Sequence, residues 1–215
     1  RLLKAKPGIE ERLASGEWSQ VFLELTSDDK SRPGWVAADL EPLAVPALQG
    51  AGNFSEREGV CRQAGEWRFR STIPALMKFL EDEAPHVRLA AVDSLAEMRA
   101  VEAVAPIGSL LADPNAKVRT DAARALFVLQ GKTATERCLP LLDDPDPAVR
   151  VEIAEMLGEQ GARESAPALV KRLTDSAFFV RVEAANALVN LKVDAIAPEL
   201  MTLLASREAR PQAAM

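Results

Sequence analysis

Apolar and polar positions recur along the central part of the chain with a period of 31 residues. The pair Val-Arg marks the period at Val87-Arg88, Val118-Arg119, Val149-Arg150 and Val180-Arg181. A leucine follows eight positions after each of these valines, at Leu95, Leu126, Leu157 and Leu188. An aspartate precedes each pair by a constant offset, at Asp82, Asp113, Asp144 and Asp175. Several ladders with one common step indicate a tandem structural repeat.

Each repeat is predicted to form two helices joined by a short turn. Apolar residues four apart give the first helix one apolar face. These pairs are Leu76/Leu80, Ile107/Leu111, Cys138/Leu142, Leu169/Leu173 and Leu200/Leu204. A turn rich in Asp and Pro follows, and the second helix begins near the Val with apolar residues at the Val and four, five and eight positions later. Prolines near the first helices (Pro74, Pro167, Pro198) and glycines after second helices (Gly131, Gly161) agree with these boundaries.

One helix pair cannot bury its apolar face alone, so neighbouring pairs must stack to form a core. The sequence therefore predicts an all-α fold, a right-handed α-α superhelix of about five helix pairs. A degenerate repeat comes before the clear ones, because Arg57 lies one period before Arg88 and Cys61 one period before Val92. We expect helices over 54–67, 40–49 and 17–25, and a turn over 28–34.

The predicted organisation has three parts, since terminal repeats are often atypical. Residues 1–53 form an N-terminal helical cap, 54–205 the repeat solenoid, and 206–215 a flexible tail rich in Ala, Arg, Gln and Pro. The chain begins at Arg1 rather than Met, which indicates a processed or trimmed form from which a signal peptide or upstream domain could have been removed. We expect a cytoplasmic location.

Composition and motifs narrow the classes of function that the chain could have. The formal net charge is −6, which argues against non-specific nucleic-acid binding, because such binding needs clustered Lys and Arg. No apolar run reaches the roughly 18–20 residues of a membrane span. Nucleophile-elbow, phosphate-loop and zinc-protease motifs are absent from the sequence. We therefore predict no cofactor and no metal, and the sequence favours a binding protein over an enzyme.

Three sets of residues that could suggest chemistry have simpler structural explanations. The sole histidine, His86, stands in a turn without a second ligand pattern. Cys61 and Cys138 occupy positions where other repeats carry Leu or Ala, so we expect small core residues. The Asp and Arg ladders are predicted to cap helices and to link neighbouring repeats by hydrogen bonds. The adjacent pair Phe178-Phe179 is either local packing under a turn or an exposed contact site.

The order of first helix, Asp-containing turn, Val-Arg and Ala-rich second helix resembles the HEAT-like repeat of phycobilin-lyase-type proteins over residues 73–204. This resemblance implies that the second helices line the concave side of the solenoid. It also implies a possible role in attaching or detaching a bilin chromophore. Hydroxylases with HEAT-like repeats use His-Glu pairs, which this sequence lacks, and HEAT-like DNA glycosylases need a basic concave surface.

The outward face of the second helices is the candidate binding site. We expect positions two, three and six after each Val to point away from the core. Acidic residues predominate at the last two positions and apolar residues at the first. The predicted partner-binding residues are Leu89, Asp93, Asp121, Arg124, Val151, Glu152, Glu155, Val182, Glu183 and Asn186.

An acidic groove beside an apolar stripe suits a basic or amphipathic protein segment. The sequence therefore predicts a non-catalytic interaction scaffold or adaptor that binds another protein on its concave face, without nucleic acid and without a membrane span. A solvated helix face without a partner is the simpler alternative. A chromophore-handling subunit similar to bilin lyases is the enzyme-like alternative. The partner, the pathway and the oligomeric state do not follow from the sequence.

Overall fold

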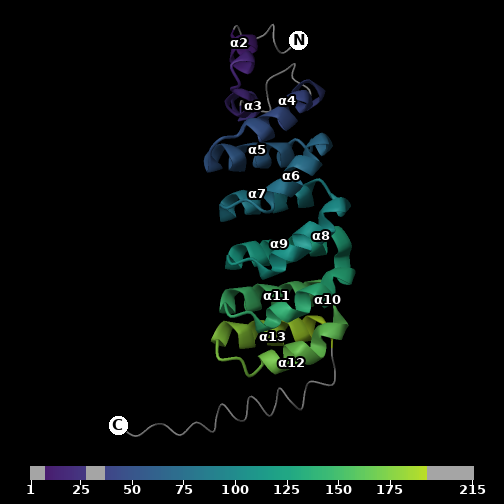
Figure 1. The fold of residues 1–215 in the computed structure, drawn as a ribbon. Helices are drawn as coiled ribbons and strands as arrows, with labels where there is room; N and C mark the ends of the chain where they lie inside the picture. Colours follow the sequence, from purple (N-terminus) through teal and green to yellow (C-terminus); the bar gives the residue numbers. More distant parts are fainter. Residues whose placement is uncertain (1–7, 28–36, 193–215) are drawn as a thin grey trace, which may run out of the picture. The chain divides into compact units, whose positions relative to one another are not determined.

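The computed structural model describes residues 8–27 and 37–192, and all regular structure within these ranges is helical (Figure 1). The chain divides into two compact units, Arg1–Leu129 and Gln130–Met215. The helices of the first unit are α2 (Ile9–Ala14), α3 (Trp18–Ser27), α4 (Ala37–Gly50), α5 (Phe54–Glu66), α6 (Ile73–Phe79), α7 (Pro85–Glu97), α8 (Val104–Ser109) and α9 (Ala116–Gln130), which ends one residue into the second. Those of the second unit are α10 (Thr135–Cys138), α11 (Pro147–Glu159), α12 (Ala166–Arg172) and α13 (Phe178–Asn190).

Stacked second helices build each unit. In the first unit α5 packs along α7, and the first helix α6 packs on α7. In the second unit α11 packs along α13, and α12 packs on α13. The first unit begins differently, because α3 packs against both α4 and α5 and takes the place of a regular repeat. The predicted all-α class with stacked helix pairs is therefore confirmed within each unit.

Helix starts follow local sequence. Asn53 caps α5, since its side-chain oxygen accepts the backbone N–H of Glu56 at 3.0 Å. The Glu56 carboxylate in turn accepts hydrogen bonds from Ser19 and Gln20 of α3, both at 2.8 Å. These contacts lower the pKa of Glu56, with the Ser19 hydrogen bond as the largest cause. Pro85 and Pro147 begin α7 and α11, where an N–H has no partner inside the helix.

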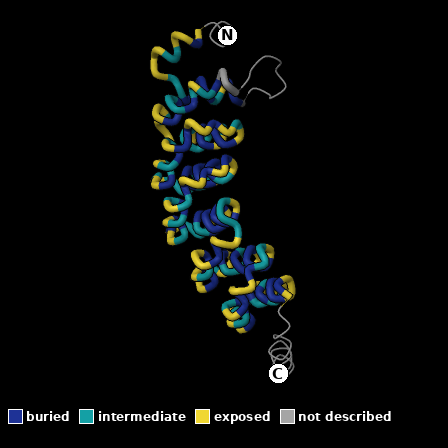
Figure 2. Tube along the Cα trace, turned by 90° about the vertical axis from the view of Figure 1, so that its right-hand side faces the viewer, coloured by how far each residue is buried: buried dark blue, intermediate teal, exposed yellow. Residues whose placement is uncertain are grey.

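The core lies between the first and second helices of each pair (Figure 2). The predicted ladders supply it: the valines of the Val-Arg pairs, Leu76, and the leucines eight positions after each Val are fully or almost fully buried. Both cysteines are buried and form no disulfide. Burial raises the pKa of Cys61 and of Cys138 to about 12, so both thiols are protonated and unreactive at neutral pH. The predicted role of both cysteines in the core is confirmed.

Helix boundaries agree with the sequence except in the first helices. The predicted helix 54–67 is α5, and the helices predicted at 17–25 and 40–49 correspond to α3 and α4. The first helices of the clear repeats are short, and 3-10 turns such as Arg70–Thr72 precede them. The expected turn at 28–34, the ladder residues Pro198, Leu200 and Leu204, and the tail 206–215 lie outside the described residues. The division into cap, solenoid and tail stays a prediction. None of the described helices is both long and apolar enough to cross a bilayer.

Candidate functional site

Arginine–aspartate links fix the start of the second helices α5, α7 and α11. Arg88 donates from Nε and Nη2 to the two carboxylate oxygens of Asp113 in the next turn, both at 2.7 Å. Its Nη1 donates to the carbonyl oxygens of Asp82 and Glu83 in its own turn. Asp113 also accepts the backbone N–H of Asn115 at 2.8 Å, which orders the turn. One guanidinium therefore ties two consecutive turns together.

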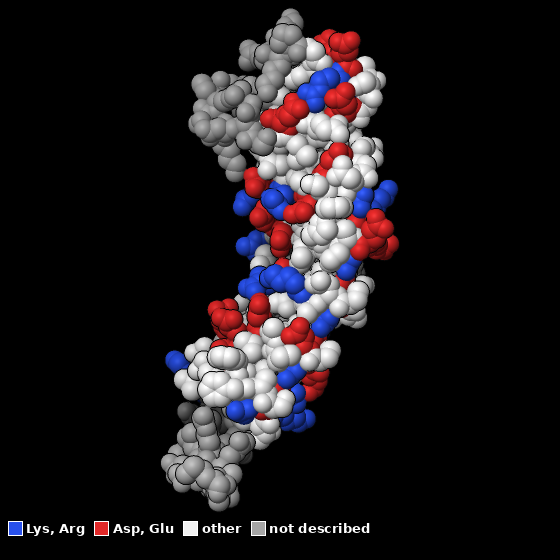
Figure 3. Space-filling model, turned by 90° about the vertical axis from the view of Figure 1, so that its left-hand side faces the viewer, with Lys and Arg blue, Asp and Glu red and all other residues white. Residues whose placement is uncertain are grey.

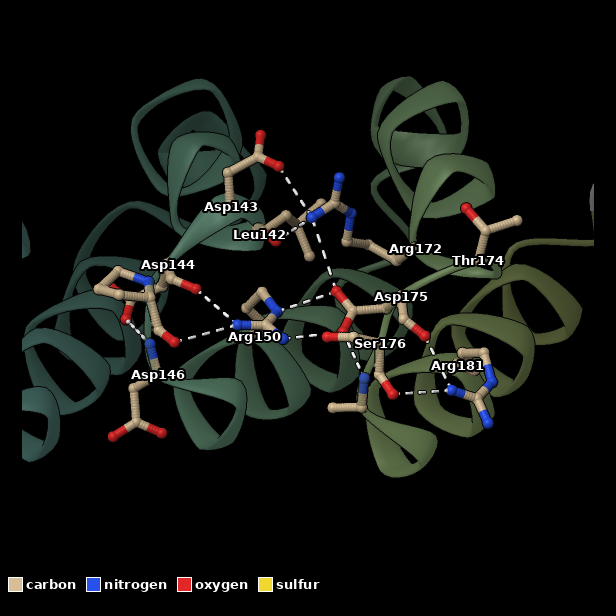
Figure 4. Close-up of polar contacts among 12 residues, drawn as sticks. Leu142, Asp143, Asp144, Asp146, Arg150, Arg172, Thr174, Asp175, Ser176 and Arg181 are labelled. Carbon is tan, nitrogen blue, oxygen red and sulfur yellow. Dashed lines mark hydrogen bonds and ion pairs between the residues drawn. The ribbon is translucent and has the colours of Figure 1, made fainter.

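The second unit repeats this arrangement (Figure 4). Arg150 donates to both oxygens of Asp175 at 2.9 and 2.8 Å and to the carbonyl oxygen of Asp144 at 2.7 Å. Burial alone would raise the pKa of Asp175, but hydrogen bonds from Arg150 and the Ala177 N–H outweigh it, so the pKa is lowered. The Asp175 pair therefore stabilises the fold above the pKa of an unfolded Asp and is lost as the pH falls through the lowered value. The predicted structural role of the two ladders is confirmed for these repeats.

The second helices α5, α7 and α9 of the first unit enclose a hollow of about 450 Å³. We call it the central hollow. Its walls carry five carboxylates and two cations together with His86, Leu89, Ala90 and Ser94. The charged residues are Glu58, Arg62 and Glu66 of α5, Asp93 and Glu97 of α7, and Lys117 and Asp121 of α9. Acidic groups therefore outnumber basic groups, and Figure 3 shows the two kinds interspersed on the side of the molecule that carries these helices.

Ion pairs neutralise part of this charge. Lys117 contacts Asp121 at 2.8 Å, Arg124 approaches the same oxygen at 4.0 Å, and Arg62 pairs with Glu58. The pKa of Asp93 is raised, first by burial and then by the charges of Asp121 and Glu97. The potential at Asp93 therefore remains negative in spite of the neighbouring cations, and a further positive group would be stabilised there.

A second hollow, of about 310 Å³, lies beside the ends of α7 and α9. We call it the arginine hollow. Arg68, Arg99 and Arg124 line it together with Asp93, Glu97 and Asp121, with Ala96, Ala125 and Val128 between them. Arg68 and Arg99 follow the ends of α5 and α7 with positive φ angles of 54° and 53°. The glycine at the equivalent place after α11, Gly161, has φ 62°, so arginine occupies a backbone position that favours glycine.

The first unit brings its four predicted site residues together. Leu89, Asp93 and Asp121 line the central hollow, and Arg124 lines the arginine hollow. In the second unit the predicted residues lie on two packed helices, Val151, Glu152 and Glu155 on α11 and Val182, Glu183 and Asn186 on α13. All four residues six positions after the Val are exposed, as expected: Asp93, Arg124, Glu155 and Asn186.

The expectation for the third position after the Val needs correction. Ala90 and Asp121 are buried, with 8% and 9% exposure, and Glu152 and Glu183 are half-buried. A residue three positions after the Val is turned only about 60° from it around the helix, whereas the sixth position is turned about 120°. The third position therefore lies closer to the core than the sixth position does. Thr120, at the second position, is buried as well.

Several lining residues were not predicted. Glu58, Arg62 and Glu66 belong to the degenerate first repeat, where no Val-Arg pair marks the register. These three residues lie one period before Leu89, Asp93 and Glu97. The period of 31 residues could therefore have identified them from the sequence. Arg68 and Arg99 gave no signal of this kind, because their role depends on a left-handed backbone after the helix.

Two remaining sequence features are now located. His86 lies in the first turn of α7 rather than in the expected turn before it. It lines the central hollow, and its ring meets the ring of Phe54 edge to face at 4.9 Å. Phe178 and Phe179 are both exposed at the start of α13, and their rings lie 5.5 Å apart. Both rings are therefore exposed rather than packed under the turn, and a role of the pair as a contact site stays a prediction. Within the described ranges no group of three or more His, Cys, Asp or Glu residues is placed to hold a metal ion.

Comparison with known proteins agrees with this architecture. The family model described as HEAT repeats matches residues 41–126 and 135–215. No curated protein matches the chain. The solved complex of CpcE and CpcF of phycocyanin lyase from Nostoc sp. PCC7120 is similar at 25% sequence identity with a TM-score of 0.59, and the match covers 82% of this chain and 73% of that one. The predicted resemblance to HEAT-like repeats is confirmed.

Two further solved structures are similar at lower scores. An engineered protein is 21% identical with a TM-score of 0.45, over 89% of this chain and 94% of that one. A designed armadillo repeat protein in complex with a peptide (KR)4 is 20% identical with a TM-score of 0.42, over 85% of each chain. Neither of these two matches bears on the proposals below.

Proposed function

The chain belongs to the HEAT repeat family, and from this premise we propose that it is an interaction scaffold that binds a basic segment of another protein in the central hollow. The observation that carries the proposal is the excess of carboxylates, five against two cations, on the walls of a hollow built by three consecutive second helices. A scaffold needs a rigid surface with side chains free to contact a partner. The buried Arg–Asp links keep the helix starts in place while the outward side chains vary.

Asp93 is the centre of the proposed contact. Its side chain is exposed at the sixth position, and partial burial of the carboxylate, followed by the charges of Asp121 and Glu97, raises its pKa. A Lys or Arg side chain of a partner would relieve this repulsion and form a charge-assisted hydrogen bond. Leu89, half-buried on the same wall, offers an apolar contact to the aliphatic part of such a side chain.

We propose a separate contact surface within the second unit, on α11 and α13. Val151 and Val182 would supply apolar contacts, and Glu152, Glu155, Glu183 and Asn186 polar ones. Lysine at positions 152 and 183 would then weaken binding without unfolding the protein, because both residues are half-buried at the edge of the helix face. Unchanged partner binding by the variant Glu152→Lys/Glu183→Lys at low salt would limit the surface to the first unit.

A direct test uses a fluorescein-labelled lysine-rich peptide and the full chain at low ionic strength. We expect saturable binding by fluorescence anisotropy, and we expect the variant Asp93→Lys/Glu97→Lys to weaken it at least about tenfold. A matched control, Glu136→Lys/Glu164→Lys, places the same charge change on exposed residues of α10 and the turn before α12. Equal losses in both variants would mean that net charge alone attracts the peptide, and the proposal would fail. Cross-linking with mass spectrometry in the native host then identifies the natural partner.

A second candidate function rests on the similarity to the phycocyanin lyase complex. In this proposal the chain is one subunit of a protein pair that attaches or detaches a bilin. Bilins carry carboxylate groups, and the arginine hollow offers Arg68, Arg99 and Arg124 as their partners. The test adds a bilin to the chain and follows its absorbance spectrum. A spectral change that is lost in Arg68→Gln/Arg99→Gln would support this function, and an unchanged spectrum with both proteins would exclude direct bilin binding.

A further inference from the structure

The outer face of α13 differs from the same face of every earlier second helix. We number positions from the Val of each repeat. The fifth position is fully buried in α5, α7, α9 and α11, where Cys61, Val92, Ala123 and Ala154 stand. In α13 the equivalent Ala185 is only half-buried. Val182 and Val189 at the second and ninth positions are 39% and 69% exposed. Together these three residues form an apolar stripe along α13.

The α11–α13 contact identifies what this face does in the repeat. Gly158, at the ninth position of α11, is buried, and a Cβ atom there would lie 2.7 Å from the Cα of Ala187 in α13. Gly65 of α5 has the same relation to α7, because a Cβ atom added to Gly65 would lie 2.8 Å from the Cα of Ser94. The fifth and ninth positions are therefore the surface on which the next second helix stacks. In α13 this stacking surface is exposed.

The polar link of the same interface is also incomplete. Arg88 and Arg150 each give their Nε and Nη2 to an aspartate of the following turn. Arg181 keeps the bonds to its own turn, from Nη1 to the carbonyl oxygens of Asp175 and Ser176. No carboxylate among the described residues bonds its Nε and Nη2, and the guanidinium lies 5.5 Å from the Phe178 ring. In the sequence, Ser206 and Pro211 stand where the period would place the next Asp and Val.

We propose that the outer face of α13 is a docking site for a helix of a second protein that is preceded by a turn with an aspartate or glutamate. The partner helix would pack on Val182, Ala185 and Val189, at a greater distance from α13 than α13 keeps from α11, because Val189 carries a side chain where α11 has Gly158. Its carboxylate would accept two hydrogen bonds from Arg181, as Asp175 does from Arg150. Asn186 and Asn190 replace the glutamates that α11 carries at the equivalent positions, Glu155 and Glu159, so α13 carries less acidic charge beside this face than α11 does. The site is separate from the central hollow.

The probe for this site is a peptide with the sequence of residues 173–192, the segment that covers α11 in the structure. The peptide carries Phe179→Lys to improve its solubility. Lys117 stands at the equivalent position of α9, so the repeat accepts Lys there. We expect the labelled peptide to bind the full chain. Val189→Glu in the chain should abolish binding, and Arg181→Gln should weaken it about tenfold. The same peptide with Asp175→Asn should bind the natural chain about tenfold more weakly than the peptide that keeps Asp175. The two peptides should bind the Arg181→Gln chain with equal affinity.

Independent, additive effects of these two substitutions would overturn the proposed Arg–carboxylate link. Failure of the peptide to bind any better than a scrambled sequence would overturn the site. Sedimentation equilibrium tests whether a second copy of this chain or its own residues 193–215 cover the outer face of α13 instead. A dimer that Val189→Glu converts to a monomer would mean that a second copy covers the face. A monomer whose peptide binding appears only after deletion of residues 193–215 would mean that this segment covers it. Asp93→Lys/Glu97→Lys should leave peptide binding unchanged, so this test stands apart from that of the central hollow.

Discussion

The turns and the outward helix faces of the repeats follow opposite rules. In the turns, the same pair of residues makes the same link, from Arg88 to Asp113 and from Arg150 to Asp175. On the outward face, the sixth position reads Arg62, Asp93 and Arg124 in the first unit, so charge alternates from one helix to the next. Residues that hold the fold are constant, and residues on the outward face vary. Periodicity therefore identifies the residues that build the fold, and departures from it mark the surface that we propose for recognition.

The largest expected effect comes from breaking a turn link. Asp113→Ala removes both hydrogen bonds to Arg88, whose side chain is only 10% exposed, and leaves a buried guanidinium without its carboxylate. We expect a loss of about 3 kcal/mol in the free energy of unfolding. Urea denaturation followed by far-UV circular dichroism measures it. The control Asp143→Ala removes an ion pair with Arg172 from a carboxylate that is 75% exposed, and should cost less than about 1 kcal/mol. Equal losses would contradict the distinction between turn and surface.

A smaller effect of opposite sign is expected at the arginine hollow. Arg68→Gly relieves a left-handed backbone position at a residue whose side chain makes no hydrogen bond within the described part of the chain. We expect a gain in stability of about 0.5–1 kcal/mol. Arg99→Gly should gain less, because Arg99 also donates to the carbonyl oxygen of Val128 at 2.6 Å. Thermal unfolding of both variants checks the order. A destabilised Arg68→Gly would mean that the arginine supports the fold rather than a ligand.

Titration of Asp93 gives a third, still smaller effect. Burial and the charges of Asp121 and Glu97 raise its pKa, so the ionised carboxylate disfavours the folded state at pH values above that pKa. Asp93→Asn should therefore raise stability at neutral pH, by less than about 0.5 kcal/mol because the side chain is exposed and screened. The gain should disappear as the pH falls below the pKa of an unfolded Asp. Melting temperatures of both proteins at neutral and acidic pH test the sign.

No effect at all is expected for thiol reagents on the native protein. Cys61 and Cys138 lie in the constant core, and burial raises the pKa of each to about 12. Iodoacetamide at mildly alkaline pH should leave both unmodified when the protein is folded and modify both in urea. Intact-mass spectrometry reads the result. Modification of either cysteine under native conditions would indicate local opening of its repeat.

The sequence was sufficient for the fold and for part of the site. The 31-residue step predicted the helix pairs, the burial of Cys61 and Cys138, and the linking role of the Arg ladder, because each of these depends on local pattern and stacking. Position in a repeat also placed Asp93 and Arg124 correctly. It failed for Asp121, because the third position lies only about 60° around the helix from the buried Val, and the side chain there is buried as well. The arginines after α5 and α7 were missed because backbone conformation, not periodicity, brings them to the hollow.

The forward reach of each arginine bears on how such a chain changes its length. Arg88 contacts the turn that follows it in the sequence, and Arg150 does the same in the second unit. Excision of residues 116–146 would join the turn of Asp113 directly to the start of α11 at Pro147, and both arginines would still meet the aspartate that follows them in the sequence. A repeat that carries this arginine and the aspartate after it can therefore be gained or lost in steps of 31 residues without loss of the links on either side, and only the sequence of side chains along the outward face would change.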